Sequence, residues 1–306
     1  MDPVHSIKIH KDSTFAMMLE AQRRGHRLWY MELEDLWLED GRAWARQRRI
    51  SVQDDAEKWY AFDDSREQPL DALDVILMRK DPPFDLNYIV TTYLLDAAQR
   101  RGALVVNPPA ALRDHNEKLA TALFPQCCVA SMTTRSMRRL HDFIVSQGET
   151  VVKPVDSMGG ASIFRANAGD LNLNVILETV TSRGSRYVMA QRYIPEITAG
   201  DKRILMVAGE AVPFSLARIP RAGEFRGNLA AGGAGHGQPL SARDRWIAAE
   251  VGPWLKQQGI LFAGLDVIGD YLTEINITSP TCVRELDAQF DLNISGQLFD
   301  AIENHA

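Results

Sequence analysis

Two carboxylates and one carboxamide near the C-terminus have the types and spacing of metal ligands. Asp266, Glu274 and Asn276 lie in the segment LDVIGDYLTEINITSP, where a Gly-Asp pair predicts a hairpin turn between the carboxylates. A three-residue loop would set the two carboxylates directly opposite each other, whereas a two-residue loop would set them on a diagonal. Glu274 and Asn276 are two residues apart, so they share one face of the sheet.

Oxygen ligands without histidine or cysteine indicate Mg²⁺, which is usually shared with the phosphates of a substrate. The alternative is a half-exposed hairpin with a polar outer face. We favour the metal site because both carboxylates lie within runs that are otherwise apolar, such as LDVI and LTEINI.

Two lysines and a glycine pair indicate a phosphate-binding site of another kind. Lys153 ends a β-branched run and is followed by Gly159 and Gly160, whose backbone N–H groups could approach an anion closely. Lys118 lies in LRDHNEKLAT, and the two lysines could hold one nucleotide as point charges. The pattern G-x-x-x-x-G-K-[ST] is absent from the chain, so phosphate would have to be held without a P-loop. A solvated lysine that closes a strand is the alternative.

The segment RIPRAGEFRGNLAAGGAGHG, residues 218–237, combines six glycines with three arginines. A flexible surface linker is one interpretation, but linkers are usually rich in Ser, Pro and Glu. A loop of this length between two structured segments is more often functional, so we expect a lid over a binding site.

Composition excludes several classes of protein. The 306 residues carry a formal net charge of −6, which argues against a nucleic-acid-binding protein but leaves room for a local basic pocket. Three cysteines without a C-x-x-C pattern make a disulfide framework or zinc site unexpected. The sequence contains no G-x-S-x-G or H-E-x-x-H motif, no apolar run long enough for a membrane span and no apolar signal segment. We therefore expect a cytoplasmic protein with no nucleic-acid or membrane partner.

The pattern of apolar residues and breakers predicts α/β and α+β architecture. Alternating elements over about the first 110 residues favour an open, mostly parallel sheet, with Arg79 and Lys80 at the carboxyl end of one strand. The expected elements there are helices over 12–25 and 87–101 and strands over 26–33, 73–80 and 103–109. A smaller α+β unit should follow, with helices near 113–123 and 134–147 and strands at Lys153 and over 187–194. From residue 196 onward, AGE and IGD turns predict antiparallel hairpins, with a helix over 241–259.

These motifs together resemble those of the ATP-grasp ligases, and in particular the bacterial glutathione synthetases. The resemblance rests on MRKDPPFD, LRDHNEKL, KPVDSMGGASIF, MAQRYIP, GDKRILMV, ARIPRAGEFRGNLAAGG and GLDVIGDYLTEINITSPTCVRELD, which occur in the family's order over essentially the whole chain. It implies an ATP-grasp fold that clasps the nucleotide between two antiparallel sheets. It also implies an N-terminal Rossmann-like domain over 1–112, a central small domain over 113–195 and a C-terminal domain over 196–306.

The resemblance implies ATP-dependent joining of γ-glutamylcysteine to glycine through an acyl-phosphate, with two Mg²⁺ ions, for which Mn²⁺ could substitute. The residues implied for ATP are Lys118, Lys153, Gly159, Gly160, Gln191, Arg192, Tyr193, Ile194 and Asp201. The implied metal ligands are Asp266, Glu274 and Asn276. Arg203 and Arg218 would face the transferred phosphate, and Arg226 and Asn228 would arrive with the lid. The dipeptide contacts are expected among Ser13, Arg79, Lys80, Ser279 and Arg284.

Three further expectations concern the whole chain. Family members carry a short apolar strand ahead of MDP, so the N-terminal sheet is expected to lack its first strand and some stability. The family also suggests a homo-oligomer, either a tetramer or a dimer. The alternatives to this function are an ATP-grasp ligase for another amino acid or peptide pair, and an ATP-binding regulatory protein without turnover.

Overall fold

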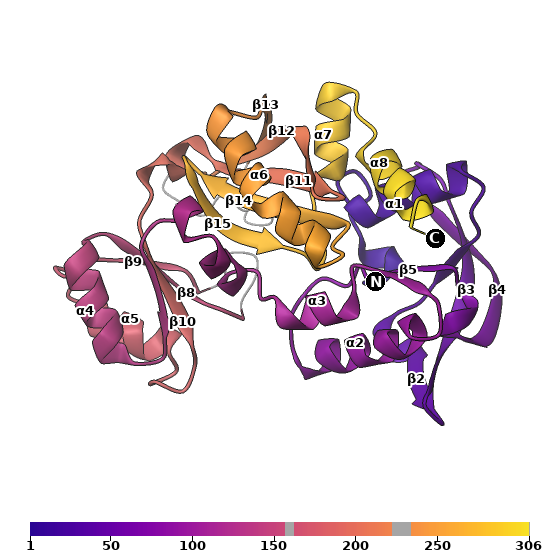
Figure 1. The fold of residues 1–306 in the computed structure, drawn as a ribbon, viewed down its shortest axis with the longest axis horizontal. Helices are drawn as coiled ribbons and strands as arrows, with labels where there is room; N and C mark the ends of the chain where they lie inside the picture. Colours follow the sequence, from indigo (N-terminus) through magenta and orange to yellow (C-terminus); the bar gives the residue numbers. More distant parts are fainter. Residues whose placement is uncertain (157–161, 222–233, 306) are drawn as a thin grey trace.

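The computed structural model describes residues 1–156, 162–221 and 234–305 of the chain. The C-terminal sheet lies in the middle of the molecule, between the N-terminal region at one end and a small central unit at the other (Figure 1). Within the described residues, no helix is both long and apolar enough to cross a membrane.

The N-terminal region is less parallel than the sequence predicts. Its largest sheet is antiparallel, and only two short strands form a parallel pair. The unexpected part is a long ribbon formed by residues 42–69, whose outward side chains are charged, so that neither of its strands contains an apolar run. The antiparallel strands are β1 (Leu28–Tyr30), β2 (Leu36–Glu39), β3 (Arg42–Val52) and β4 (Tyr60–Pro69), and the parallel pair is β5 (Val75–Leu77) with β6 (Leu104–Val106).

Two predicted N-terminal helices are confirmed, and each begins at an aspartate that caps it. The Asp12 carboxylate accepts a hydrogen bond from the Phe15 N–H at 2.7 Å, and the Asp85 carboxylate accepts one from the Tyr88 N–H at 2.9 Å. These helices are α1 (Ser13–Arg23) and α2 (Leu86–Gln99).

The helix predicted near 113–123 is wrong. Helix α3 (Pro109–Asp114) ends early, and a separate 3₁₀ turn covers Leu119–Leu123. The side chain of Asn116 accepts hydrogen bonds from the Lys118 and Leu119 N–H groups at 3.0 and 3.1 Å. It thereby competes with helical hydrogen bonding and breaks the segment just before Lys118.

The central unit is a four-stranded antiparallel sheet with two helices packed on it. Leu140 and Ile144 of one helix and Leu177 of the other form its core together with Val152 and Val188 of the sheet. The strands, in spatial order, are β7 (Ser131–Thr134), β10 (Val188–Arg192), β8 (Thr150–Pro154) and β9 (Phe164–Ala166), and the helices are α4 (Met137–Gln147) and α5 (Leu173–Val180).

The C-terminal sheet is antiparallel, as predicted, and is covered on both faces. Ile204 and Met206 belong to the same core cluster as helix α6, whereas Leu205 and Val207 cluster with α7 and α8. The strands, in spatial order, are β13 (Ala234–Pro239), β12 (Glu210–Ile219), β11 (Asp201–Val207), β14 (Phe262–Ile268) and β15 (Tyr271–Asn276). The helices are α6 (Ala242–Gln257), α7 (Val283–Phe290) and α8 (Ile294–Glu303).

A buried asparagine fastens the N-terminal region to the β14–β15 hairpin at one edge of this sheet. The Asn107 amide nitrogen donates to the carbonyls of Phe262 and Ile277 at 2.7 and 2.6 Å. Its oxygen accepts from the N–H groups of Leu261 and Phe262, both at 3.0 Å. Asn107 therefore satisfies backbone groups around the start of β14 and just after the end of β15, at the open end of this hairpin.

Replacing this side chain should strongly destabilise the protein. Asn107→Ala would leave up to four buried backbone groups short of a partner, so we expect the free energy of unfolding to fall by about 3 kcal/mol. Denaturant unfolding measures the change, and Asn174→Ala on the exposed face of α5 is the control, expected to lie within about 0.5 kcal/mol of the parent. Equal stability of the two variants would contradict the role of Asn107.

Candidate active site

A β-bulge brings the two predicted metal carboxylates directly opposite each other. The turn between β14 and β15 has two residues, since Ile268 pairs with Tyr271, and this alone would set the carboxylates on a diagonal. However, the register shifts after the pair formed by Val267 and Leu272. Thr273 is the extra residue, and its hydroxyl donates to the Asp266 carbonyl at 3.1 Å. Asp266 therefore lies opposite Glu274.

Asp266 is buried between two arginines on one face of the sheet. Arg203, opposite it on β11, donates through Nε and Nη2 to its two oxygens at 2.5 and 3.1 Å. Arg218 of β12 approaches the same carboxylate at 2.9 Å. Burial alone would raise the pKa of Asp266, but the two guanidinium groups outweigh it and lower the pKa to about 2. Asp266 therefore stays ionised.

Asp201 extends this network and has an oxygen to spare. Its Oδ2 atom accepts from Arg218 at 2.5 Å, while its Oδ1 atom is buried without a hydrogen-bond partner among the described residues. Burial raises the pKa of Asp201 to about 7, although Arg218 opposes the shift. A buried oxygen without a partner is costly in a folded protein, so this atom has the character of a ligand-binding group.

A second group of charges surrounds Glu274. Its carboxylate lies 3.1 Å from the Lys153 ammonium and 3.7 Å from that of Lys118, and Lys118 also pairs with Glu117. Burial raises the pKa of Glu274, but the two lysines reverse the shift and lower it. Burial likewise lowers the pKa of Lys118, but Glu274 and Glu117 more than compensate and raise it. Glu274 and Lys118 therefore both stay charged.

This second group joins three segments that are far apart in the sequence. Lys153 belongs to β8 of the central unit, Glu274 to β15 of the C-terminal sheet, and Lys118 to the link between helix α3 and the central unit. The Glu117 carbonyl accepts a hydrogen bond from the Ile275 N–H at 2.8 Å, which holds the link against β15. The site therefore lies where the two antiparallel sheets face each other.

The predicted adenine-binding residues lie at the end of β10, in the central sheet. Gln191 is buried, and its Nε2 atom has no hydrogen-bond partner among the described residues. The N–H groups of Arg192 and Tyr193 donate to Ala130 and Glu149 at 2.9 and 2.8 Å, so the backbone there is fixed by the neighbouring segments. Ile194 is also buried and follows directly.

The predicted dipeptide residues separate into two groups. Ser13 accepts a hydrogen bond from the Val283 N–H at 3.2 Å, and buried Arg79 donates to the Pro280 carbonyl at 2.9 Å. Both therefore contact the segment that follows β15. The others have different surroundings: Lys80 pairs with Asp2 at 2.7 Å, Arg284 pairs with Asp54 at 2.5 Å, and Ser279 is half-buried between β15 and α7.

Part of the predicted lid is strand. Arg218 lies in β12 and is buried, and it pairs across the ladder with Gly235 of β13. The ends of the loop predicted over 218–237 are therefore a β-ladder. The lid residues Arg226 and Asn228 and the phosphate-loop residues Gly159 and Gly160 lie outside the described residues.

The predictions missed three residues that organise the site. Glu117, next to Lys118, was visible in HNEKL as a second carboxylate but was not considered. The bulge at Thr273 and the clamp at Asn107 leave no signal in the sequence, since each depends on a partner strand. No cluster of three His, Cys, Asp or Glu side chains suited to a metal occurs in the described part of the chain, so any metal here would also need the Asn276 oxygen or ligand atoms.

Comparison with known proteins settles the family. Residues 1–113 match the N-terminal domain of prokaryotic glutathione synthetase, and residues 117–291 match its ATP-grasp domain. The chain belongs to the prokaryotic glutathione synthetase family. The resemblance inferred from the motifs, the ATP-grasp fold and the class of ATP-dependent ligase are thereby confirmed.

Curated relatives agree over nearly the whole length. A glutathione synthetase of Xanthomonas campestris is 60% identical over 303 residues, covering 99% of this chain and 96% of the relative. One from Pseudomonas aeruginosa is 58% identical over 302 residues, covering 99% of this chain and 95% of the relative. Among solved structures, the ATP-grasp ligase PsnB complexed with minimal precursor superposes with a TM-score of 0.64 at 17% identity, over 100% of this chain and 96% of PsnB. That likeness concerns the fold alone.

Close packing around Arg203 provides a test of the charge network. A methyl group added at Gly264 would lie 2.8 Å from Arg203 Cδ and 3.1 Å from Pro280 Cβ. Gly264→Ala should therefore push Arg203 away from Asp266 and lower the ligase turnover about 10- to 100-fold.

The control is a similar clash away from the site. A methyl group at Gly252 in α6 would meet the Gly209 carbonyl oxygen at 2.3 Å. We expect Gly252→Ala to lower stability by about 1–3 kcal/mol while turnover per folded molecule stays unchanged. Unchanged turnover in Gly264→Ala would contradict the role of Arg203.

Proposed function

We propose that this enzyme joins γ-glutamylcysteine to glycine at the expense of ATP, producing glutathione, ADP and phosphate. The observation that carries the proposal is the pair of opposed carboxylates, Asp266 and Glu274, each held by two cations at the junction of two antiparallel sheets. Relatives named glutathione synthetase, 55–60% identical over nearly the full length, support the choice of substrates.

ATP would lie between the central and C-terminal sheets. Lys118 and Lys153 would hold its α- and β-phosphates, with Gly159 and Gly160 nearby. Gln191, together with Arg192, Tyr193 and Ile194, would line the adenine slot, and Asp201 would bind the ribose. Two buried atoms without partners, Gln191 Nε2 and Asp201 Oδ1, support this arrangement because nucleotide groups could satisfy them. This placement of ATP is also consistent with a division of the chain into domains over 1–112, 113–195 and 196–306, which we propose as well.

Asp266, Glu274 and Asn276 would hold Mg²⁺. Two carboxylates and a carboxamide on one face of the sheet are a donor set suited to a hard cation that is shared with phosphates. Bound Mg²⁺ would neutralise negative charge on the phosphates. We propose two ions, with Mn²⁺ as a possible substitute. In the structure, lysines pair with Glu274 and arginines pair with Asp266. Bound phosphates would attract these cations and leave the two carboxylates free for the metal.

The chain's own residues would act mainly by neutralising charge. The cysteinyl carboxylate of the dipeptide attacks the γ-phosphorus of ATP, ADP leaves, and an acyl-phosphate forms. Glycine's amine then attacks the acyl carbon and displaces phosphate. Buried Arg203 and Arg218 would stabilise the transferred phosphoryl group at both stages. Arg226 and Asn228 would close with the lid and keep water from the acyl-phosphate.

The dipeptide would enter from the N-terminal side. Ser13 and Arg79 contact the 280–283 segment, and Pro280 lies close to Gly264 beside Arg203. We assign these two residues to the dipeptide pocket ahead of Lys80, Ser279 and Arg284.

We also propose a homo-oligomer, a dimer or tetramer, that works in the cytoplasm. Exposed apolar side chains at Leu86, Val90 and Tyr93 follow one another at helical spacing along α2. Such a stripe on a surface helix supports association with a second copy.

The reaction can be tested directly. Purified protein mixed with ATP, Mg²⁺, γ-glutamylcysteine and glycine should form the tripeptide in step with phosphate, as measured by mass spectrometry and phosphate release. Glu274→Gln should reduce tripeptide formation by about 100-fold or more. Glu210→Gln, which alters an exposed carboxylate paired with Lys256, is the matched control and should leave the rate unchanged.

The outcomes distinguish the candidate functions. Comparable turnover with another amine in place of glycine would indicate a ligase for a different pair. ATP binding without any turnover would indicate a regulatory protein and would overturn the proposal.

Removing the metal should show whether nucleotide binding depends on a divalent cation at Asp266 and Glu274. With EDTA present, turnover should cease, and ATP should raise the melting temperature much less than ATP with Mg²⁺ does. Without the metal, the phosphates would lie close to the carboxylates of Asp266 and Glu274, with no divalent cation to offset the repulsion. An equal thermal shift by ATP with and without the metal would contradict the assignment of these two residues.

A further inference from the structure

Arg79 differs from the other buried cations that the structure describes. The buried lysine and arginine side chains in the described ranges are Arg79, Lys118, Lys153, Lys202, Arg203 and Arg218. The last five each form an ion pair with a carboxyl group, whereas Arg79 forms none with a described residue. A buried charge without an opposite charge is costly, so Arg79 is suited to an anion that comes from a ligand.

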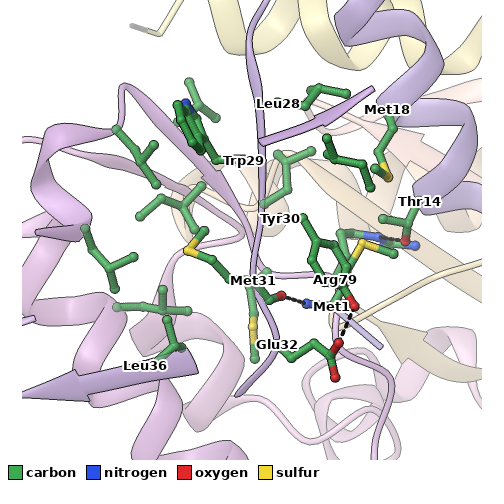
Figure 2. Close-up of a pocket in the computed structure, with 18 of the residues that line it drawn as sticks. Met1, Thr14, Met18, Leu28, Trp29, Tyr30, Met31, Glu32, Leu36 and Arg79 are labelled. Atoms are coloured by element: carbon green, nitrogen blue, oxygen red, sulfur yellow. Dashed lines mark hydrogen bonds between the residues drawn. The ribbon is translucent and has the colours of Figure 1, made fainter. Parts of the chain in front are cut away.

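The contacts of Arg79 hold it in place without neutralising it. Its Nε atom donates to the Thr14 hydroxyl at 3.1 Å, as Figure 2 shows, and its Nη2 atom donates to the Pro280 carbonyl at 2.9 Å. The guanidinium carbon also lies 5.7 Å from the centre of the Phe262 ring. All three partners are uncharged. Since a guanidinium has five N–H donors, these two hydrogen bonds do not use its full capacity.

Arg79 lies where α/β sheets usually bind their ligands. It follows β5 by two residues, at the carboxyl end of that strand. Together with Thr14 it lines an apolar cavity of about 180 Å³ between β1 and β5 (Figure 2). The carboxylate that lines this cavity belongs to Glu32, which accepts from the Tyr30 hydroxyl at 2.7 Å and from Arg48 at 3.2 Å. Glu32 therefore serves other partners.

A buried hydroxyl lies near the same guanidinium. Tyr88 of α2 is 1% exposed, and its hydroxyl has no hydrogen-bond partner among the described residues. Burial raises the pKa of Tyr88, and the positive charge of Arg79 opposes this shift. Buried polar groups in native proteins are almost always hydrogen-bonded, so this hydroxyl is a second group that a ligand would satisfy.

Two carboxylates lie at longer range from Arg79. Asp12, the cap of α1, precedes Thr14 by two residues, and Asp81 follows Arg79 by two. Burial lowers the pKa of Arg79, and the negative charges of Asp12 and Asp81 oppose this shift. A ligand that carries a carboxylate beside an ammonium group suits these surroundings, because it offers an anion to Arg79 and a cation to the two aspartates.

We propose that Arg79, Tyr88, Asp12 and Asp81 form a specificity site for the α-amino-acid head group of the γ-glutamyl residue. This inference rests on the proposed function, in which the donor is γ-glutamylcysteine. Arg79 and Tyr88 would donate to the α-carboxylate, and Asp12 and Asp81 would accept from the α-ammonium. A γ link leaves both groups free on the α-carbon, whereas an α link uses the α-carboxyl group in the peptide bond. The site would therefore select γ-linked donors.

The test uses the full chain and three donors that differ only at the head group. They are γ-glutamylcysteine, N-glutarylcysteine, which lacks the ammonium, and N-(4-aminobutanoyl)cysteine, which lacks the carboxylate. Product formation by mass spectrometry at saturating ATP, Mg²⁺ and glycine gives kcat/KM for each donor. The parent chain should prefer γ-glutamylcysteine over each analogue by about tenfold or more.

Two variants should lose activity toward different donors. Tyr88→Phe should lower kcat/KM about tenfold for the two donors that carry the carboxylate and leave it within about twofold for the aminobutanoyl donor. Asp81→Asn should show the opposite pattern, with a loss of about tenfold for the two donors that carry the ammonium and none for the glutaryl donor. Tyr187→Phe, which alters an exposed ring of the central unit, is the control and should change none of the values.

Each comparison is made within one variant, so a loss of folded protein cancels. Equal losses for all three donors would indicate a structural role and overturn the inference. Equal turnover of the three donors by the parent chain would also overturn it. Calorimetric binding of the same donors to the parent and to Tyr88→Phe gives the comparison without turnover. A chain that binds γ-glutamylcysteine through its head group but forms no tripeptide would therefore refute the proposed function alone.

Discussion

The site depends on the burial of one carboxylate, Asp266, between two arginines. A buried ion pair is expensive to desolvate, and removing one partner leaves an uncompensated charge. The antiparallel ladder overcomes this difficulty by register: Arg203 is opposite Asp266, and Arg218 is opposite Asp201. Each cation therefore reaches its carboxylate without leaving its strand.

Each cluster contains as many carboxyl groups as cations. Asp201 and Asp266 face two arginines, while Glu117 and Glu274 face two lysines. A polyphosphate that enters such a site competes with four carboxyl groups for four cations. Under the proposed function, divalent metal ions would resolve this competition, because Asp266 and Glu274 would hold them while the lysines and arginines turned to the phosphates. An acidic protein can thus offer a strongly anion-binding centre without a basic surface.

The sequence predicted the site's residue types better than their geometry. Asp266 and Glu274 were expected on adjacent strands, but whether they were opposite or diagonal was left open, because a bulge is a property of two paired strands and not of either alone. The apolar spacing predicted a helix that continues past Asn116. In the structure the helix ends at Asp114, because the Asn116 side chain accepts a hydrogen bond from the Lys118 N–H. The 42–69 ribbon was missed since its outward charges hide the alternation on its inner face. A partner strand decided the first of these cases, whereas a local contact of one side chain decided the second.

The cavity in the N-terminal region is connected to the site through its walls. Thr14 and Arg79 both line it, and the Arg79 Nε atom donates to the Thr14 hydroxyl at 3.1 Å. Arg79 also holds the Pro280 carbonyl, and Pro280 packs close to Gly264 beside Arg203. An unfilled void lets its walls shift, because the atoms on one side lack contacts. Arg79 therefore links the packing of this cavity to the position of Arg203 beside Asp266.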